Sequence, residues 1–568
     1  MNSTLSQSRP DLRQRSLSQA IAVSISGALM LGLQVALSDQ AHAQVFPASI
    51  QPSSLDGSNG FVLNGEAEGD ASGFSVSAAG DINGDGVDDL LIGAIAADPN
   101  GSSSGRSYVL FGTDHGLPNP FQLSSLDGSN GFVLNGESQD DYSGISVSGA
   151  GDVNGDGIDD LIIGATRASP NGIFSGRSYV VFGSAADLPN PFELSSLDGS
   201  NGFVLNGEAQ YDNAGRAVSG AGDINGDGIN DLLVGAMGAN ANGQSSGRTY
   251  VVFGDGTGMP AVLELSSLNG TSGFVLNGEA EGDFSGRSLS AAGDINGDGM
   301  DDLIIGADGA APNGGFSGRS YVVFGASAGL PNPFELSNLD GSNGFVLNGE
   351  AQGDDSGISV SGVGDINGDD VDDLIIGAPG ANASGRSYLV FGNSAGFNAE
   401  LELSSLNGSN GIVINGAAAG DFAGFSVSAA GDINGDGIDD LIVGAYRADT
   451  IGNNSNAGRS YVVFGAPRLP NPFELSSLNG NNGFVVDGEV FGEVSGRSVS
   501  AGGDINGDGI GDIVIGADGA NANGIGDVGR SYVVFGRSNT LFVDGFEADQ
   551  PTRSCLVCKD ASTIRMSP

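Results

Sequence analysis

The feature that most constrains the fold is a repeat with a period of about 71 residues. The acidic stretch "DINGDGVDDLLIGA" at positions 81–94 returns six times, with the first aspartate at Asp152, Asp223, Asp294, Asp365, Asp432 and Asp504. The successive spacings are 71, 71, 71, 71, 67 and 72 residues. Versions of "SSLDGSNGFVLNGE" and "GDASGFSVSAAG" precede each copy, and a version of "GRSYVLFG" follows it. A period this long and regular indicates an array of supersecondary units.

Each unit contains four strand-like runs, "FVLNG", "FSVSA", "DLLIGA" and "SYVVFG". They are rich in Val, Ile, Phe and Tyr, are bounded by turn-forming residues, and lack a helical stripe. Seven such units predict an all-β fold, a seven-bladed β-propeller of four-stranded antiparallel blades. A linear β-solenoid is the alternative, but it usually has shorter repeats and needs end caps. The length changes in the fifth and sixth units fall between the runs, as expected for correctly placed strands.

The order of the runs predicts how the ring closes. The array begins with "FVLNGE" and ends after "GRSYVVFG" at Gly536, so the last unit lacks an outer strand and the first has one to spare. We expect residues 61–66 to pair with residues 530–535. The predicted organisation is a signal segment at 1–43, a propeller at 53–540 with units beginning at residues 53, 124, 195, 266, 337, 404 and 476, and a tail at 541–568.

The acidic loop has the spacing of a calcium ligand set. Positions 1, 3, 5 and 9 of the first copy are Asp81, Asn83, Asp85 and Asp89, and position 7 offers the backbone carbonyl of Val87. Oxygens at every second residue of a curled loop can surround Ca²⁺, which takes six to eight of them, whereas Mg²⁺ prefers to keep its waters. "NGDG" is also a good hairpin turn, but three carboxylates in one loop would repel one another without a cation. We therefore predict up to seven bound Ca²⁺ ions.

The same positions in the other copies complete the predicted metal ligands. They are Asp152, Asn154, Asp156, Ile158, Asp160, Asp223, Asn225, Asp227, Ile229, Asp231, Asp294, Asn296, Asp298, Met300, Asp302, Asp365, Asn367, Asp369, Val371, Asp373, Asp432, Asn434, Asp436, Ile438, Asp440, Asp504, Asn506, Asp508, Ile510 and Asp512. Position 12, where a helix–loop–helix calcium site needs a bidentate Glu, is aliphatic in every copy, so this loop is predicted to join two strands. The fifth site is expected to be the weakest, because Asp370 replaces the glycine at position 6.

These units resemble FG-GAP repeats, which form the seven-bladed propeller at the N-terminus of integrin α chains. The resemblance covers about residues 53–540, and "GDINGDGVDDLLIGA" is its most specific element. It implies a propeller with calcium on D-x-(D/N)-x-D-G-x-x-D loops, at the positions named above. The sequence departs from the pattern in having Ser-Gly or Ala-Gly for "FG" and in keeping "GAP" at the end of the "DLLIGA" run only in the fifth unit, at residues 377–379. Integrin α chains usually carry the loop in only some blades, and their leg domains and membrane span have no counterpart here.

Charge and the N-terminal segment indicate the environment. With 69 acidic and 20 basic residues the formal charge is −49, which excludes a nucleic-acid partner held by phosphate contacts. Arg9, Arg13 and Arg15 precede the apolar run 20–37 and an "AHA" at 41–43, which predicts a cleaved secretory signal, with an uncleaved anchor as the alternative. No later run is long enough to span a membrane. We expect a secreted, extracellular or cell-surface protein, or a periplasmic one if retained.

Function is less constrained than fold. The first choice is an adhesion or binding module that takes a protein or glycan on the face opposite the calcium loops. The segment after the signal holds one histidine, His115, and cysteines only at 555 and 558 in the tail, so we expect no enzyme. A secreted hydrolase, since FG-GAP propellers also occur beside phospholipase domains, and a purely structural surface or matrix protein are the alternatives. The near-identity of the units predicts no cluster of non-repeated polar residues over the central channel.

One arginine recurs in every "GRSY" or "GRTY". These residues are Arg106, Arg177, Arg248, Arg319, Arg386, Arg459 and Arg530. They could form a basic ring for an acidic ligand, but we favour structural arginines paired with nearby carboxylates or carbonyls.

Overall fold

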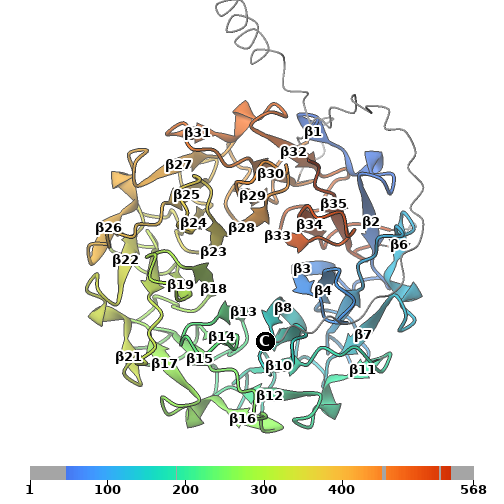
Figure 1. Ribbon diagram of the computed structural model, residues 1–568, viewed down its shortest axis with the longest axis horizontal. Helices are drawn as coiled ribbons and strands as arrows, with labels where there is room; N and C mark the ends of the chain where they lie inside the picture. The colour runs from blue at the N-terminus through green and yellow to red at the C-terminus, as the bar shows by residue number, and fades with distance from the viewer. Residues whose placement is uncertain (1–45, 187, 451–455, 523–525, 539–568) are drawn as a thin grey trace, which may run out of the picture.

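The protein is a seven-bladed β-propeller in which seven sheets surround a central opening (Figure 1). The structure, a computed structural model, describes residues 46–186, 188–450, 456–522 and 526–538. The innermost strands of blades 1 to 7 are β3 (Ser72–Gly80), β8 (Ser143–Gly151), β13 (Ala217–Gly222), β18 (Ser288–Gly293), β23 (Ser359–Gly364), β28 (Ser426–Gly431) and β33 (Ser498–Gly503). They carry the small-sided "SVSAAG" run, which fits the crowded position nearest the axis.

The next two strands of each blade form antiparallel ladders on the inner strand. The second strands are β4 (Asp89–Ala94), β9 (Asp160–Ala165), β14 (Asp231–Ala236), β19 (Asp302–Ala307), β24 (Asp373–Ala378), β29 (Asp440–Ala445) and β34 (Asp512–Ala517). The third strands are β5 (Arg106–Leu110), β10 (Arg177–Val181), β15 (Arg248–Val252), β20 (Arg319–Val323), β25 (Arg386–Val390), β30 (Arg459–Val463) and β35 (Arg530–Val534).

The fourth strands continue the antiparallel pattern. They are β7 (Gly131–Asn135), β12 (Gly202–Asn206), β17 (Gly273–Asn277), β22 (Gly344–Asn348), β27 (Gly411–Asn415), β32 (Gly483–Asp487) and, in blade 7, β2 (Gly60–Asn64). β2 pairs with β35, Phe61 opposite Val533 and Asn64 opposite Arg530. The predicted closure of the ring by the N-terminal strand is confirmed.

Each blade has a fifth strand that the sequence did not predict. These strands are β11 (Phe192–Glu193), β16 (Val262–Glu264), β21 (Phe334–Glu335), β26 (Glu400–Glu402), β31 (Phe473–Glu474), β1 (Ser49–Ile50) and β6 (Phe121–Gln122). Each runs parallel to a fourth strand, as where Phe121 pairs with Leu63. A four-stranded blade was therefore one strand short, because two or three residues in a connection are too few to show a strand pattern.

A single-turn 3-10 helix precedes every fourth strand. These helices are η1 (Pro52–Ser54), η2 (Leu123–Ser125), η3 (Leu194–Ser196), η4 (Leu265–Ser267), η5 (Leu336–Asn338), η6 (Leu403–Ser405) and η7 (Leu475–Ser477).

The hydrophobic core lies between blades. All six residues of β4 are buried, because alternate side chains of a strand point to the blade before and the blade after. Leu90 and Tyr108 of blade 1 thus share a core with Val514 and Val533 of blade 7. Every blade depends on both neighbours for burial, so the ring is stable only as a whole.

Candidate functional site

The acidic loops join the first and second strands of each blade. Loop 1 runs from Gly80, at the end of β3, to Asp89, at the start of β4, so the expected strand-to-strand connection is confirmed. A register shift between Ala78 and Gly80 turns the chain out of the ladder. Because the ladders are antiparallel, the first and third connections of every blade lie on one face, which we call the loop face. The second connections and those between blades lie on the opposite face.

Within loop 1 the first two carboxylates hold the backbone. Asp81 accepts hydrogen bonds from the amides of Asp85 at 2.9 Å and Gly86 at 2.8 Å, and Asp85 accepts one from Val87 at 3.0 Å. Gly86 has a φ of +89°, which a residue with a side chain adopts only with strain. The same pattern holds in loop 5, where Asp370 takes that place with a φ of +66°.

The position-9 aspartate lies beneath the loop. Asp89 is fully buried and accepts hydrogen bonds from the amides of Ile82 at 3.1 Å and Gly112 at 2.8 Å. The Nδ2 of Asn83 lies 3.3 Å from its Oδ2. Asp89 therefore joins the start of the loop to the connection that follows β5.

Burial makes this carboxylate costly to ionise. Burial, and then repulsion from Asp85 and Asp81, raises the pKa of Asp89 to about 8. The pKa of the corresponding aspartates is raised in every other loop, at Asp160, Asp231, Asp302, Asp373, Asp440 and Asp512. None of the ion pairs between described residues involves a position-9 aspartate.

This donor chemistry fits a hard cation. Each loop supplies three carboxylates, one of them buried and without a basic partner, and an amide; in loop 6 the Oδ1 of Asn434 is buried with no hydrogen-bond partner among described residues. The carboxylates of positions 1 and 5 point to backbone amides, and the described part of the chain gathers no three His, Cys, Asp or Glu side chains in metal-holding geometry.

A residue at position 8, absent from the predicted ligands, connects neighbouring loops. The Oδ2 of Asp159 in blade 2 accepts a hydrogen bond from the amide of Asp81 in blade 1 at 2.9 Å. The contact recurs around the ring to Asp88, which accepts from the amide of Asp504 at 2.8 Å. Gly511 occupies position 8 in blade 7, so the junction of blades 6 and 7 lacks this side chain. An acid or amide at position 8 in six of seven copies was the available signal.

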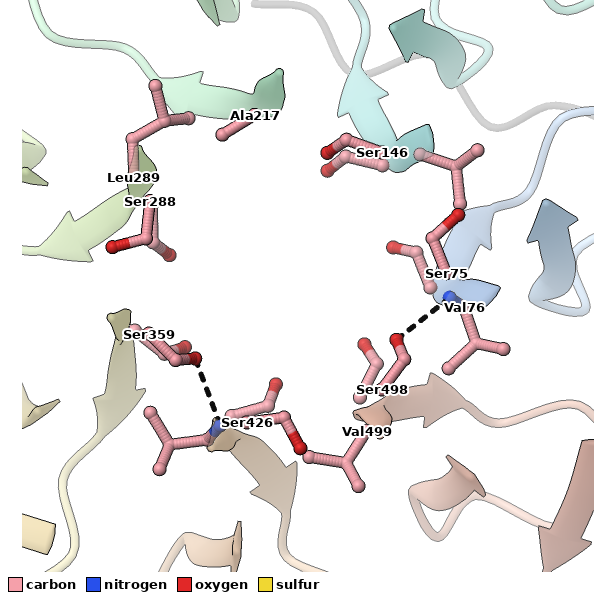
Figure 2. Close-up of a pocket in the computed structure, with 18 of the residues that line it drawn as sticks. Ser75, Val76, Ser146, Ala217, Ser288, Leu289, Ser359, Ser426, Ser498 and Val499 are labelled. Atoms are coloured by element: carbon pink, nitrogen blue, oxygen red, sulfur yellow. Dashed lines mark hydrogen bonds between the residues drawn. The ribbon is translucent and has the colours of Figure 1, made fainter. Parts of the chain in front are cut away.

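The innermost strands line an axial channel of about 310 Å³ (Figure 2). Serines of neighbouring blades connect across its wall: Ser75 Oγ donates to the carbonyl of Gly144 at 2.8 Å, and Ser498 Oγ accepts from the amide of Val76 at 3.1 Å. Such bonds occupy strand edges that would otherwise be unpaired. Ala217 in blade 3 has no hydroxyl at this position and lies near Leu289 of blade 4 (Figure 2).

At the channel mouth on the opposite face, the seven blades do not carry the same residue. The residue before each of these serines, or before Ala217, differs from blade to blade: Phe74, Ile145, Arg216, Arg287, Ile358, Phe425 and Arg497. The expectation of no non-repeated polar cluster over the channel was wrong, because three arginines enter here. Substitutions at one position per repeat are hidden by the near-identity of the rest.

A model of the FG-GAP repeat matches residues 72–110, 143–181, 214–252, 285–323, 356–390, 423–463 and 495–534. The chain is an FG-GAP repeat protein. Each matched segment begins at or just before the inner strand and ends at or near the end of the third strand, so it contains the acidic loop.

Two kinds of curated relatives share the FG-GAP region. Integrin alpha pat-2 of Caenorhabditis elegans is 30% identical over 256 residues, which are 43% of this chain and 18% of the relative. Integrin alpha-5 of Xenopus laevis is 29% identical over 37% of this chain and 19% of its own length. Human phosphatidylinositol-glycan-specific phospholipase D is 29% identical over 417 residues, 69% of this chain and 45% of the relative. The FG-GAP chain thus spans less than half the length of these relatives.

Five of the "GRSY" or "GRTY" arginines of the FG-GAP repeats join neighbouring blades, and those of blades 6 and 7 bond within their own blade. Arg106 in blade 1 donates through Nε to Asn135 at 3.0 Å and through Nη1 to Glu66, beyond the fourth strand of blade 7, at 2.5 Å. Equivalent ion pairs join Arg177, Arg248, Arg319 and Arg386 to a glutamate, and Arg459 pairs with Asp487. Arg530 donates to Asn64 at 3.0 Å. The structural interpretation of these arginines is confirmed.

Two predictions concern segments at the ends of the chain. The signal segment at 1–43 and the tail with Cys555 and Cys558 lie outside the described residues. Among the residues that are described, no helix has the length and apolar character to cross a membrane. His115 is exposed in the third connection of blade 1, and its Nδ1 lies 2.9 Å from Oδ1 of the adjacent Asp114.

Proposed function

We propose that this FG-GAP propeller is an exported calcium-binding protein that recognises a protein or glycan partner through the face opposite the acidic loops. One observation carries the proposal. Of the six exposed large hydrophobic side chains among described residues, all but Val262 lie in connections of that face: Ile173, Tyr211, Phe316, Val490 and Phe491. Exposed aromatic and aliphatic side chains that lie on one face and not on the other favour that face as the binding surface.

Calcium supplies fixed positive charge in this proposal. In loop 1 it would be held by Asp81, Asn83, Asp85, Asp89 and the carbonyl of Val87, and the other loops would use their corresponding residues. Its role is structural: it offsets the carboxylates, including the one that burial makes unfavourable to ionise. The loop face then serves as a scaffold.

The relatives support two classes of function. The integrin alpha relatives favour a binding role, and the match over 69% of this chain to a phosphatidylinositol-glycan-specific phospholipase D makes a hydrolase the second candidate. The channel lining consists of Ser, Val, Leu, Ala, Phe, Ile and Arg, without a histidine or carboxylate for acid–base catalysis. That composition favours recognition. A purely structural matrix protein would differ in having no saturable partner.

Titration calorimetry of residues 44–568 with Ca²⁺ tests the metal. We expect a stoichiometry approaching seven, and much weaker heat with Mg²⁺. Absence of Ca²⁺ binding would overturn this half of the proposal.

Arrays of matrix proteins and glycans, screened with Ca²⁺ present, test the face. Any hit is measured again with a triple variant, Tyr211→Ser, Phe316→Ser and Phe491→Ser. Binding should be lost in the triple variant and kept in Val262→Ser, which removes an exposed hydrophobic side chain from the blade edge. Equal loss in both variants, or retention in both, would contradict the assignment.

A further inference from the structure

The mouth of the axial channel holds three arginines that the repeat does not explain. Arg216, Arg287 and Arg497 occupy the same place in blades 3, 4 and 7, one residue before the inner strand. The backbone sets this place, because the amide of each donates to the carbonyl three residues earlier, at 3.2, 3.1 and 3.2 Å respectively. All three line the channel, together with Phe74 and Phe425.

Two of the three arginines have their own counter-ion. Arg287 contacts Asp308 at 3.0 Å, and Arg497 contacts Asp518 at 3.5 Å. In both blades the aspartate lies 21 residues after the arginine, in the sequence "GADGA". Both carboxylates are largely buried, with side-chain exposures of 7% and 10%.

Arg216 lacks this counter-ion. The residue 21 positions later is Met237, in "GAMGA", and Arg216 forms no ion pair with any described residue. It is half-buried, and burial, followed by repulsion from Arg287 and Arg497, lowers its pKa, although Asp308 acts in the opposite direction. A half-buried guanidinium with five donors and no carboxylate is unfavourable unless an anion approaches it.

The surroundings of Arg216 also break the repeat. Ala217 follows it where the other six blades have serine, so no hydroxyl there can accept from the wall of blade 4 (Figure 2). The rest of the mouth is apolar, formed by Phe74, Ile145, Ile358 and Phe425, and the guanidinium carbon of Arg497 lies 4.6 Å from the centre of the Phe74 ring.

We propose that Arg216, supported by Arg287 and Arg497, forms a binding site for a single carboxylate carried by an apolar peptide segment of a partner protein. The planar guanidinium matches a carboxylate through two parallel hydrogen bonds. The phenylalanine and isoleucine side chains at the mouth suit the apolar neighbours of that carboxylate. A chain with a formal charge of −49 repels polyanions, which disfavours a sulfated glycan and favours one acidic group inserted into a small cavity.

This inference rests on the proposed binding role of the same face, but a small probe tests it without a partner. The probe is 4-fluorobenzoate, followed by fluorine NMR of the propeller in Ca²⁺, and its neutral analogue 4-fluorobenzamide is the control. We expect the carboxylate to bind at least about tenfold more tightly than the amide, because a hydrogen-bonded charge pair is lost in the amide. Equal binding of the two probes would overturn the proposal.

Two variants locate the site. Arg216→Ala should remove benzoate binding, and Met237→Asp should weaken it by about tenfold or more, because it gives Arg216 the counter-ion that Arg287 and Arg497 already have. Arg468→Ala removes an exposed arginine from the loop face and should change nothing. The Met237→Asp result decides the matter if Arg216→Ala misfolds, and unchanged binding in Met237→Asp would overturn the site.

Competition with inorganic sulfate distinguishes a carboxylate on an apolar segment from a free, hydrophilic oxyanion. Inorganic sulfate should displace the probe only at much higher concentration, because it cannot use the apolar rim. Displacement by sulfate at concentrations similar to benzoate would mean a hydrophilic oxyanion ligand and would overturn the peptide assignment. Failure of probe binding while array hits still depend on Tyr211, Phe316 and Phe491 would reject this site and leave the proposed function standing.

Discussion

The two faces of the propeller differ in how closely the seven blades repeat one another. On the loop face, Asp89 and its six counterparts are all buried, and burial raises the pKa of each of these carboxyl groups. On the opposite face, the residue that enters each inner strand varies from phenylalanine to arginine. A repeat is kept where every blade needs the same interaction. It is relaxed where the ring needs one distinct site, because a sevenfold surface alone offers seven equal ones.

Removal of calcium should have the largest effect, because it acts on all seven loops together. If Ca²⁺ stands tenfold above its dissociation constant, each site contributes about 1.4 kcal/mol, or about 10 kcal/mol in total. For a propeller of this size that corresponds to a loss of about 10 °C in Tm. Thermal unfolding in 2 mM Ca²⁺ and in EDTA measures it, and an unchanged melt would mean that the loops are only turns.

The pH dependence without calcium should be the next largest effect. The folded-state pKa of Asp89 is about 8, above the ordinary value of 3.8, so between these pH values the folded state binds more protons than the unfolded state. Stability is therefore highest below about pH 4 for this group and is lost as pH rises toward 8. We expect the calcium-free Tm to fall by several degrees from pH 5 to pH 8.5.

Saturating Ca²⁺ provides the control for this pH profile. The bound metal holds the carboxylates ionised, so the decline with rising pH should disappear and the stabilisation by Ca²⁺ should be greatest near pH 8. A calcium-free Tm that rises across this range would contradict the assigned burial of the position-9 aspartates.

The junctions between loops give a smaller and more local test. Asp159→Gly removes the acceptor for the amide of Asp81 and should cost about 1–2 kcal/mol of unfolding free energy. Asp159→Asn should cost less, because Asn230 makes the same contact in blade 3, at 3.1 Å. Urea unfolding in Ca²⁺ distinguishes the two variants.

The junction of blades 6 and 7, which has glycine at position 8, allows the missing hydrogen-bond acceptor to be added. Gly511→Asp places a carboxylate beside the amide of Asp432, where an added Cβ would meet atoms no nearer than 3.9 Å. We expect a gain of about 0.5–1 kcal/mol. Destabilisation by this variant would show that charge repulsion in loop 6 outweighs the added hydrogen bond.

Asp370→Gly should produce the smallest change. Its φ of +66° is strained for a residue with a side chain, so glycine should raise stability by about 0.5–1 kcal/mol and tighten calcium binding in loop 5. Gly299→Asp in loop 4 is the matched control: its φ is +90° and no atom lies within 4 Å of an added Cβ, so only backbone strain should lower stability. If both variants melted at the temperature of the unmodified protein, backbone strain at position 6 would not distinguish loop 5 from loop 4.

The sequence predicted what repetition makes visible. Runs such as residues 89–94 gave the strands, the spare run at 61–66 gave the closure, and the seven aligned aspartates gave the candidate loops. The two-residue strand at 121–122 was missed because no local pattern is that short. Arg216 was missed for another reason: its significance depends on Met237, 21 residues away, and on a channel that only the assembled ring creates.

The closure of the ring determines when the molecule can be finished during synthesis. β2 lies near the start of the described residues, and β35, its antiparallel partner, is the last strand among them. The paired residues Asn64 and Arg530 lie 466 positions apart in the sequence. The edge of β2 that faces β35 must stay unpaired until β35 has been made, and a product truncated before β35 would expose a free strand edge on each side of the gap. The design therefore gives the cell a simple check on completeness, because an unfinished chain cannot hide its edges.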